Sequence, residues 1–439
     1  MVKRSPPNSH VLGQSLWERT AAPGPKLEPL AGARKADVAV IGAGLAGLST
    51  ALHLAEKGLA VTVIEADEVG SGATGKSGGL LAPDMISHCP SAIERLFGSE
   101  RGSRLLRMVG SSASQCFELI EKYDLSCDAE QTGFWTPAHD AAVASTLQSR
   151  AHEWQARGFN VHYAEPGETA ACLGTNRYLG AIRFDDGGTV DPLALSRGLA
   201  ATARRFGAEI YGQSPVTSLN RHGSGWRVET DHGLVEAERV VLAANGGNPA
   251  LHPALRHTIL PLDVVEFATA PLSEAQRSSI LRDRISFTDK RAYIFTARYD
   301  AAGRLVSAFP NFMVKRSGAA LFAEAARRIE QFYPALKGLP IEYLWHGRAW
   351  INPALLPSVH DLGEGAFAIQ ACNGRGITTN VVLGKELAAA LEQRDPACLS
   401  VVPAAPVPVR AHRLARYAPS ALMLLAFLRS RLFRSAKAD

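Results

Sequence analysis

Val38-Ala-Val-Ile-Gly42-Ala-Gly44-Leu-Ala-Gly47 is the stretch of sequence that decides the fold of this chain. Its first four residues form a short apolar run, which is typical of a buried parallel strand. A segment with helical periodicity follows over residues 45–57 and ends at a glycine, and a second apolar run covers residues 60–64. The pattern predicts a β-α-β unit with three glycines in the turn before its helix.

The glycine spacing predicts a site for a dinucleotide. The first glycine permits a tight turn, the second lets a pyrophosphate approach the backbone, and the third lets the helix pack on the strand. The helix N-terminus offers unpaired N–H groups to the phosphates. Glu65, which follows the second strand, can accept hydrogen bonds from a ribose. An ordinary glycine-rich turn is the alternative, but strand, helix, strand and acid together favour dinucleotide binding.

A second glycine-rich segment favours a flavin over a nicotinamide. Residues 70–79 contain five glycines together with Thr74, Lys76 and Ser77. Backbone amides in such a loop can form an anion-binding nest and lie flat against a ring system. A flexible linker is the alternative, although linkers do not usually follow the second strand of a dinucleotide fold directly.

The rest of the chain alternates between two kinds of structure. Asp191 and Pro192 predict the N-cap and first turn of a helix that runs to residue 206. Strands are expected at 208–212, 216–219, 225–230, 234–236 and 240–244. Residues 250–345 are rich in aromatics and alternate like an antiparallel sheet. A buried strand over 366–371, a turn over 373–376 and a helix over 378–392 follow, so the domains are expected to be interleaved.

Composition excludes several classes of protein. The chain has 439 residues, 46% hydrophobic and 20% charged, which indicates a globular protein with more than one core. Its six cysteines have no C-x-x-C spacing, so no disulfide scaffold and no metal site is expected, and a cytoplasmic location is indicated. There is no signal-peptide pattern, and no window reaches the roughly 18 apolar residues of a spanning helix.

The net charge of +5 is a property of the C-terminal tail. Seven of the 47 Lys/Arg and one of the 42 Asp/Glu lie from residue 401 onward, which leaves 40 basic and 41 acidic residues in the body. A neutral body implies no nucleic-acid partner. The tail also holds the apolar run 421–428, flanked by arginines. We expect it to pack on the body or on a dimer partner, and the alternative is peripheral contact with a membrane.

These motifs resemble the D-amino-acid-oxidase-like superfamily of FAD-dependent oxidoreductases, and within it the bacterial gamma-glutamylputrescine oxidase branch. The matching blocks are residues 37–65, 70–79, 188–192 with the helix that follows, and 367–391, and the segment 15–20 is similar to the start of that branch. The resemblance implies an α/β fold, in which a Rossmann-like FAD-binding domain is interleaved with an α+β substrate domain built on an antiparallel sheet.

The resemblance also implies domain boundaries and FAD-binding residues. The expected segments are an N-terminal extension (1–35), FAD-binding parts (36–115, 187–248 and 346–400), substrate-domain parts (116–186 and 249–345) and a basic, apolar tail (401–439). The expected FAD-binding residues are Gly42, Gly44, Leu45, Ala46, Gly47, Glu65, Ala66, Gly72, Ala73, Thr74, Lys76, Ser77, Gly78, Gly79, Leu80, Val216, Asn245, Gly374, Arg375, Gly376 and Ile377.

Two departures from the family pattern bear on the chemistry. Many relatives have histidine between the last two glycines, where this chain has Arg375, a cation that can stabilise an anionic reduced flavin. Relatives that oxidise amino acids carry a carboxylate-binding arginine in a motif like W-x-G-x-R-P, and here Ala349 takes its place. An amine substrate is therefore favoured. The cysteine motif of covalent flavin attachment is absent, so non-covalent FAD is expected and Cys372 is predicted to be a structural thiol.

The resemblance implies oxidation of an amine C–N bond. A neutral amine would pass a hydride from its α-carbon to flavin N5, and the resulting imine would hydrolyse. The expected substrate is a gamma-glutamylputrescine-like or other primary or secondary amine, as in polyamine catabolism. Without a second dinucleotide motif, O2 or a quinone is the expected electron acceptor. Candidates for the pocket, chosen by position alone, are Tyr293, His346, Arg348, His360 and Arg375.

Two other functions stay open at this point. One is a D-amino-acid or glycine-type dehydrogenase that binds its carboxylate in a different way. The other belongs to a different class, a flavin-bearing assembly protein without turnover, because fold does not determine function. The oligomeric state also stays open.

Overall fold

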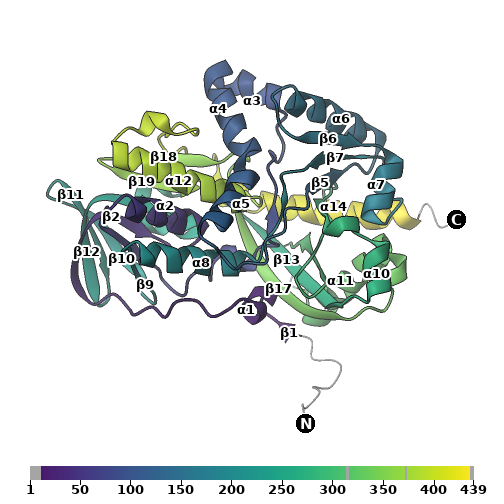
Figure 1. Cartoon of the computed structure of the whole chain (residues 1–439), viewed down its shortest axis with the longest axis horizontal. Helices are drawn as coiled ribbons and strands as arrows, with labels where there is room; N and C mark the ends of the chain where they lie inside the picture. Colours follow the sequence, from purple (N-terminus) through teal and green to yellow (C-terminus); the bar gives the residue numbers. More distant parts are fainter. Residues whose placement is uncertain (1–10, 313–315, 371–372, 436–439) are drawn as a thin grey trace, which may run out of the picture.

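Two large sheets organise the part of the chain that the structure describes, which is residues 11–312, 316–370 and 373–435 of a computed structural model. Figure 1 shows the two sheets beside each other, with the eight-stranded sheet on the left and the nine-stranded sheet on the right. Each has its own covering helices. The predicted α/β architecture, with an antiparallel sheet in its second half, is confirmed.

The eight-stranded sheet is built around the predicted β-α-β unit. Its strands are β2 (Gly32–Ile41), β3 (Val61–Ile64), β9 (Glu209–Tyr211), β10 (Val216–His222), β11 (Gly225–Thr230), β12 (Gly233–Leu242), β18 (Ser358–Gly363) and β19 (Ala366–Gln370). β12, β2, β3 and β9 run parallel to one another in that order. On its other side β12 pairs with β11 along its first half and with β19 along its last three residues.

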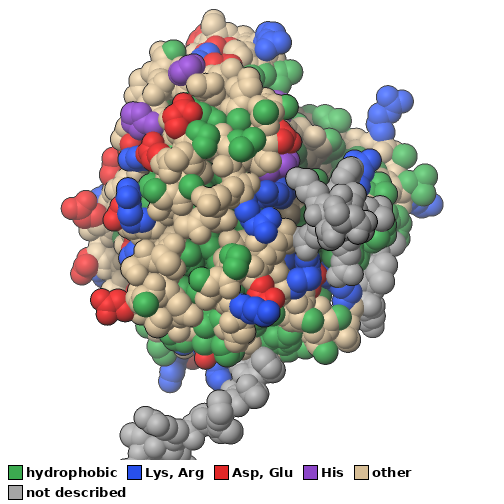
Figure 2. Space-filling view, turned by 90° about the vertical axis from the view of Figure 1, so that its right-hand side faces the viewer, with side chains coloured by type: hydrophobic (Ala, Val, Ile, Leu, Met, Phe, Trp, Pro, Cys, Tyr) green, Lys and Arg blue, Asp and Glu red, His purple; other side chains and the backbone are tan. Residues whose placement is uncertain are grey.

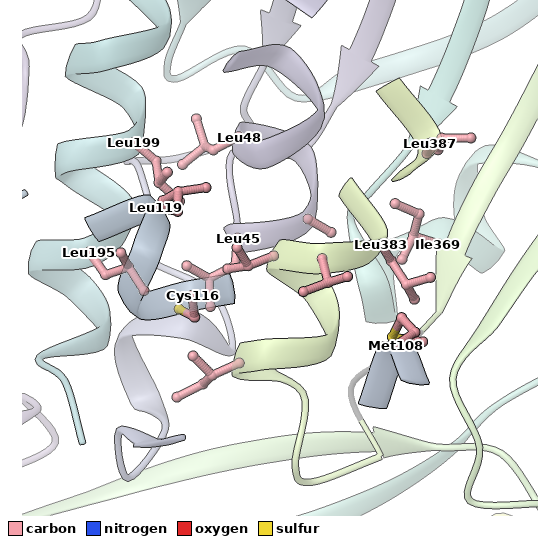
Figure 3. Close-up of a cluster of buried hydrophobic side chains, with 14 of the residues drawn as sticks. Leu45, Leu48, Met108, Cys116, Leu119, Leu195, Leu199, Ile369, Leu383 and Leu387 are labelled. Atoms are coloured by element: carbon pink, nitrogen blue, oxygen red, sulfur yellow. The ribbon is translucent and has the colours of Figure 1, made fainter. Parts of the chain in front are cut away.

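Helices cover this sheet and form the first core. They are α2 (Leu45–Glu56), α4 (Ser99–Gly110), α5 (Ser112–Lys122), α8 (Pro192–Arg205) and α12 (Ile377–Gln393). Figure 3 shows Leu48 of α2, Leu119 of α5 and Leu199 of α8 gathered in this core, and Leu383 of α12 beside Met108 and Ile369. Each fully buried leucine stabilises the fold by roughly 1.5–3 kcal/mol. Asp191 is the N-cap of α8, as predicted, because its carboxylate accepts hydrogen bonds from the N–H groups of Leu193 and Ala194, both at 2.9 Å.

The nine-stranded sheet carries the second core. Its strands are, in spatial order, β1 (Val11–Leu12), β17 (Ile341–Ile351), β13 (Leu260–Pro271), β16 (Arg304–Pro310), β15 (Thr296–Tyr299), β14 (Ser286–Thr288), β5 (Phe134–Pro137), β7 (Ala181–Phe184) and β6 (Val161–Ala164). Pairing is antiparallel except between β1 and β17 and between β14 and β5. One face packs on α11 (Gly318–Phe332) through stacked rings such as Phe295 on Phe332, whose centroids lie 3.8 Å apart.

The remaining helices lie around the two sheets. They are α1 (Leu16–Thr20), α3 (Pro90–Phe97), α6 (Ala141–Gln155), α7 (Pro166–Leu173), α9 (Asn248–Leu251), α10 (Glu274–Ser279), α13 (His412–Ala415) and α14 (Ala418–Ser435). A two-stranded ribbon joins β4 (Leu80–Leu81) to β8 (Gly188–Thr189), and a 3-10 turn covers Thr74–Lys76.

Four of the predicted segment boundaries fall inside regular elements. The boundary after residue 35 lies in β2, the one after residue 115 in α5, the one after residue 248 in the short helix α9 (Asn248–Leu251), and the one after residue 345 in β17. The strands expected at 234–236 and 240–244 are one continuous strand, β12. Glu236, Glu238 and Arg239 interrupt the apolar pattern in the middle of this strand, while its hydrogen-bonded pairing with β2 continues past them.

The C-terminal tail forms a helix that lies against the body. In α14, side chains of Met423, Leu424, Ala426 and Phe427 pack on the second core. The Phe427 ring lies 5.4 Å from the ring of Tyr293. No described helix is long and apolar enough to cross a membrane. On the face seen in Figure 2, hydrophobic side chains are interspersed with both kinds of charge.

Candidate active site

A cavity of about 750 Å³ lies between the two sheets. One wall comes from the glycine turn after β2, the loop 70–79 and the N-terminus of α12. The opposite wall comes from the face of the nine-stranded sheet that does not pack on α11. Ligand cavities of enzymes have this size and position.

The glycine turn forms one end of the cavity. Gly42, Gly44, Leu45 and Ala46 line it, whereas Gly47 lies behind them. A Cβ on Gly47 would lie 2.0 Å from the carbonyl oxygen of Gly42, so this glycine allows α2 to pack against the end of β2. Gly44 is the N-cap of α2 and supplies no side-chain cap, so the first N–H groups of the helix stay available to a ligand.

Glu65 stands at the end of β3, as predicted, and also lines the cavity. Its carboxylate accepts hydrogen bonds from the backbone N–H of Ala43 at 2.6 Å and of Asp67 at 3.1 Å. Burial raises the pKa of this carboxyl. Glu65 therefore ties the glycine turn to the following loop.

Three buried side chains hold the loop 70–79 in place. Trp17 and Trp345 donate indole N–H bonds to the carbonyls of Ser77 and Lys76, at 2.7 and 3.1 Å. Arg298 donates to the carbonyl of Gly79 at 2.9 Å. Because all three bind carbonyl oxygens, they orient the loop without occupying its N–H groups. The sequence gives no signal for these contacts, since each joins residues far apart in the chain.

Most of the predicted FAD-binding residues lie around this one cavity. Those that line it are Gly42, Gly44, Leu45, Ala46, Glu65, Ala66, Gly72, Ala73, Thr74, Lys76, Ser77, Gly78, Gly79, Leu80, Val216, Asn245, Gly374, Arg375, Gly376 and Ile377. The Lys76 ammonium is turned toward Glu18, 2.6 Å away. Cys372 lies outside the described residues.

A cluster of charges borders the cavity near α12. The Arg375 guanidinium lies 3.6 Å from the Asp84 carboxylate, and Arg150 binds the same carboxylate at 2.5 Å. Lys290 donates to the carbonyl of Ile86 at 2.7 Å. Burial, together with the charges of Arg375 and Arg150, lowers the pKa of Lys290 to about 7. The cluster carries more positive than negative charge.

The other predicted pocket residues fall in different places. Tyr293 and His360 do not line the cavity: Tyr293 packs among Phe309, Phe427 and Arg328, and His360 bonds to Gln370 at 3.0 Å. His346 is exposed on β17 and does not line the cavity either. Alternation along a strand sends it to the face opposite Gly347 and Ala349.

Arg348 and Ala349 take different positions at the cavity. Arg348 lies at the rim, where its side chain is 54% exposed and pairs with Asp263 at 2.6 Å. Ala349 is buried in the wall. A Cβ on Gly374 would lie 3.8 Å from the Cβ of Ala349, so Ala349 is next to the turn before α12.

Two observations indicate that the residues around the cavity can bind FAD. The two helices that point their N-termini at the cavity, α2 and α12, begin at glycines without side-chain caps, which leaves N–H donors for phosphate and flavin oxygens. The Nη1 atom of Arg375 is buried and, apart from its ion pair with Asp84 at 3.6 Å, has no hydrogen-bond partner among the described residues. A buried donor of this kind is costly unless a ligand pairs with it.

Known proteins share both the sequence pattern and the fold. Residues 37–390 match the DAO family, described as FAD dependent oxidoreductase. The chain is 28% identical over 354 residues to gamma-glutamylputrescine oxidoreductase of Escherichia coli strain K12, covering 80% of this chain and 82% of that protein.

Solved structures with the same fold include a glycine oxidase and an L-amino acid deaminase. Glycine oxidase from Geobacillus kaustophilus is 21% identical, with a TM-score of 0.68 over 82% of this chain and 95% of that one. L-amino acid deaminase from Proteus myxofaciens is 16% identical, with a TM-score of 0.71 over 87% and 95%. Since the family match spans most of its length, this chain belongs to the DAO family of FAD dependent oxidoreductases.

Proposed function

We propose that this chain oxidises the C–N bond of a primary or secondary amine, such as a gamma-glutamylputrescine-like compound, with non-covalently bound FAD. One observation carries the proposal: Ala349, which takes the place of the carboxylate-binding arginine expected from the resemblance to amino-acid-oxidising relatives, lies in the cavity wall. The adjacent Arg348 is at the rim and already paired with Asp263. The 28% identity to gamma-glutamylputrescine oxidoreductase supports the same substrate class.

The chain's own residues bind and orient the reactants. The bound flavin would supply the two-electron oxidation, taking a hydride equivalent from the carbon that carries the amine nitrogen. Arg375 supplies a cation beside the N-terminus of α12, where helix dipole and guanidinium both favour negative charge. The small side chains of Ala308, Gly347 and Ala349 leave room for substrate along the sheet.

Non-covalent attachment is supported by the lining of the cavity. No cysteine or histidine among the described residues lines it, so the described side chains include none that would form a thioether or imidazole link to the flavin. Electrons would leave to O2 or to a quinone, because the sequence holds no second dinucleotide motif.

A second candidate is oxidation of an amino acid. It is favoured by the cations of Arg375 and Lys290 at the cavity, which would attract a substrate carboxylate from a direction other than residue 349.

Anaerobic reduction of the FAD-loaded protein tests both candidates. Bleaching of the flavin absorbance is followed with gamma-glutamylputrescine, 1,4-diaminobutane, glycine and D-alanine at equal concentration. Faster reduction by the first two supports the proposal, and faster reduction by glycine or D-alanine contradicts it. An Ala349→Arg variant provides the matched control, because it should shift the preference toward amino acids.

A further inference from the structure

Glu266 places a carboxylate in the wall of the cavity. It lies on β13, where Leu262, Val264 and Glu266 face the cavity while Val265 and Phe267 face the second core. Only 8% of Glu266 is exposed. Its strand neighbours are Ala308 on β16 and Trp345 on β17, neither of which carries a charge.

This carboxylate has no hydrogen bond or ion pair within the described residues. The charged group that faces it is Arg298 on β15, and that guanidinium binds the backbone carbonyls of Gly79, Val190 and Tyr299 instead. Lys76, on the loop across the cavity, is paired with Glu18. A buried carboxylate without a partner destabilises a protein, so its presence in a cavity wall indicates a ligand that supplies the missing donor.

The position of Glu266 relates it to the loop 70–79. A Cβ on Gly78 would lie 3.2 Å from its Oε2 atom, so the carboxylate reaches the backbone of the segment predicted to flank the flavin. A donor bound to Glu266 therefore lies beside that segment. The other cations at the cavity contact different groups: Arg375 pairs with Asp84, and Lys290 donates to the carbonyl of Ile86.

We propose that Glu266 is the residue that binds the substrate's amine nitrogen and accepts its proton. This inference rests on the proposed amine oxidation and names the group of the chain that selects a cationic substrate. The amine arrives as R–CH2–NH3+ and donates an N–H bond to the carboxylate. One proton then passes from nitrogen to a carboxylate oxygen, which gives a carboxylic acid and a neutral amine with a free lone pair. Only this neutral form can lose hydride from its α-carbon.

The ionisation of Glu266 gives the proposal a pH signature. Burial raises the pKa of its carboxyl from 4.5 to about 8, and the charge of Arg298 partly opposes that rise. A cationic amine needs the ionised form, so its affinity should fall as the pH drops below about 8. In the unfolded chain the group ionises near 4.5. Between these two pH values the Glu266 carboxyl is protonated in the folded protein and ionised in the unfolded chain. The free energy of unfolding should therefore decrease as the pH rises from about 4.5 to about 8.

The test compares Glu266→Gln with the wild-type FAD-loaded protein. Affinity is measured anaerobically from the change in flavin absorbance, with 1-butylamine, 1-butanol and butyrate as probes of equal size and different charge. Losing a charge-assisted hydrogen bond should weaken binding of 1-butylamine by about 10- to 100-fold. Butanol affinity should change little, and butyrate affinity should stay or rise. Glu342→Gln is the matched control, because Glu342 lies on the same sheet, pairs with Arg304 and does not line the cavity.

Thermal unfolding across pH provides a readout that does not depend on activity. Glu266→Gln should melt at a higher temperature than wild type at pH 9, with the difference narrowing toward pH 5. If Glu266 only stabilised the fold, Glu266→Gln would instead melt at a lower temperature than wild type. Glu266→Asp, which keeps the charge at shorter reach, should retain the pH dependence of amine binding with reduced affinity.

The outcomes separate this inference from the proposed function. If amines reduce the wild-type flavin and Glu266→Gln binds 1-butylamine as tightly as wild type, the assignment of Glu266 is overturned while amine oxidation stands. If no amine reduces the wild-type flavin but amino acids do, the proposed function fails, and this inference fails with it.

Discussion

The indole nitrogen of Trp17 donates a hydrogen bond to the carbonyl oxygen of Ser77, 2.7 Å away and 60 residues later in the chain. Trp17 is only 1% exposed, and its ring contacts Trp345 edge-on at 6.3 Å between centroids. The short helix α1 is thereby joined to the loop predicted to flank the flavin and to the nine-stranded sheet.

Replacing Trp17 with phenylalanine should weaken retention of FAD. The substitution keeps an aromatic ring but leaves the Ser77 carbonyl without its donor, which removes about 1 kcal/mol of loop stability and should raise the Kd for FAD about fivefold. Fluorescence of released FAD during dialysis measures the effect. Trp226→Phe is the control, since Trp226 donates an equivalent bond to Glu364 far from the cavity. Equal loss in both variants would contradict a specific role for Trp17.

Gly44→Val should abolish loading of FAD. A Cβ on Gly44 would already lie 3.4 Å from Thr74 Oγ1, and the two methyl groups of valine would occupy the cavity where a pyrophosphate must approach the backbone. The yellow colour and the 450 nm absorbance of the purified protein provide the measurement. Gly167→Val in α7 is a matched control, because nothing lies within 4 Å of its Cβ position. Normal colour in Gly44→Val would argue against the predicted site.

Lys290→Met should stabilise the protein most at low pH. In the folded state the pKa of Lys290 is lowered to about 7 by burial and by the neighbouring arginines, so below that pH the fold contains an unfavourable charge. As the pH rises from about 7 to about 10.5 the unfolded chain binds more protons, and wild-type stability should increase. The variant should gain on the order of 2 kcal/mol at pH 6 and little at pH 10. Urea midpoints at several pH values measure this difference in stability. A difference that does not change with pH would refute the lowered pKa of Lys290.

A chain ending at Ser400 should be less stable than the full chain. It loses Met423 from the cavity wall and exposes the rings of Tyr293 and Phe312, which Phe427 contacts at 5.4 and 5.0 Å. A lower melting temperature and stronger binding of a hydrophobic dye should result. Flotation with anionic liposomes at low salt tests the alternative that the tail contacts a membrane, because Leu422 and Leu425 point outward from α14. We expect neither chain to float, and flotation of the full chain alone would assign the outer face of α14 to lipid.

The local part of the fold was predictable, because it depends on short-range patterns. The predicted helix over 45–57 corresponds to Leu45–Glu56, and the predicted N-cap Asp191 makes its two bonds. The position of Glu266 was not predictable, because a single acid in an alternating strand reads as a solvent-facing residue. Whether that face meets water or a cavity depends on how the two sheets are placed. Lys290 and Arg298 also give no signal in the sequence, because each contacts residues far away in the chain.

The pairing of β12 has a consequence for how the chain can be made. Val240, Val241 and Leu242 pair with β2 on one side and with β19 on the other, and β19 begins at Ala366, more than a hundred residues later. During synthesis from the N-terminus, this apolar edge therefore stays open while the whole of residues 243–365 leaves the ribosome. An open edge of this kind is a template for pairing with other nascent chains. We expect biosynthesis of this protein to depend on chaperones that bind exposed strands, and its yield to improve when translation is slowed or the temperature is lowered.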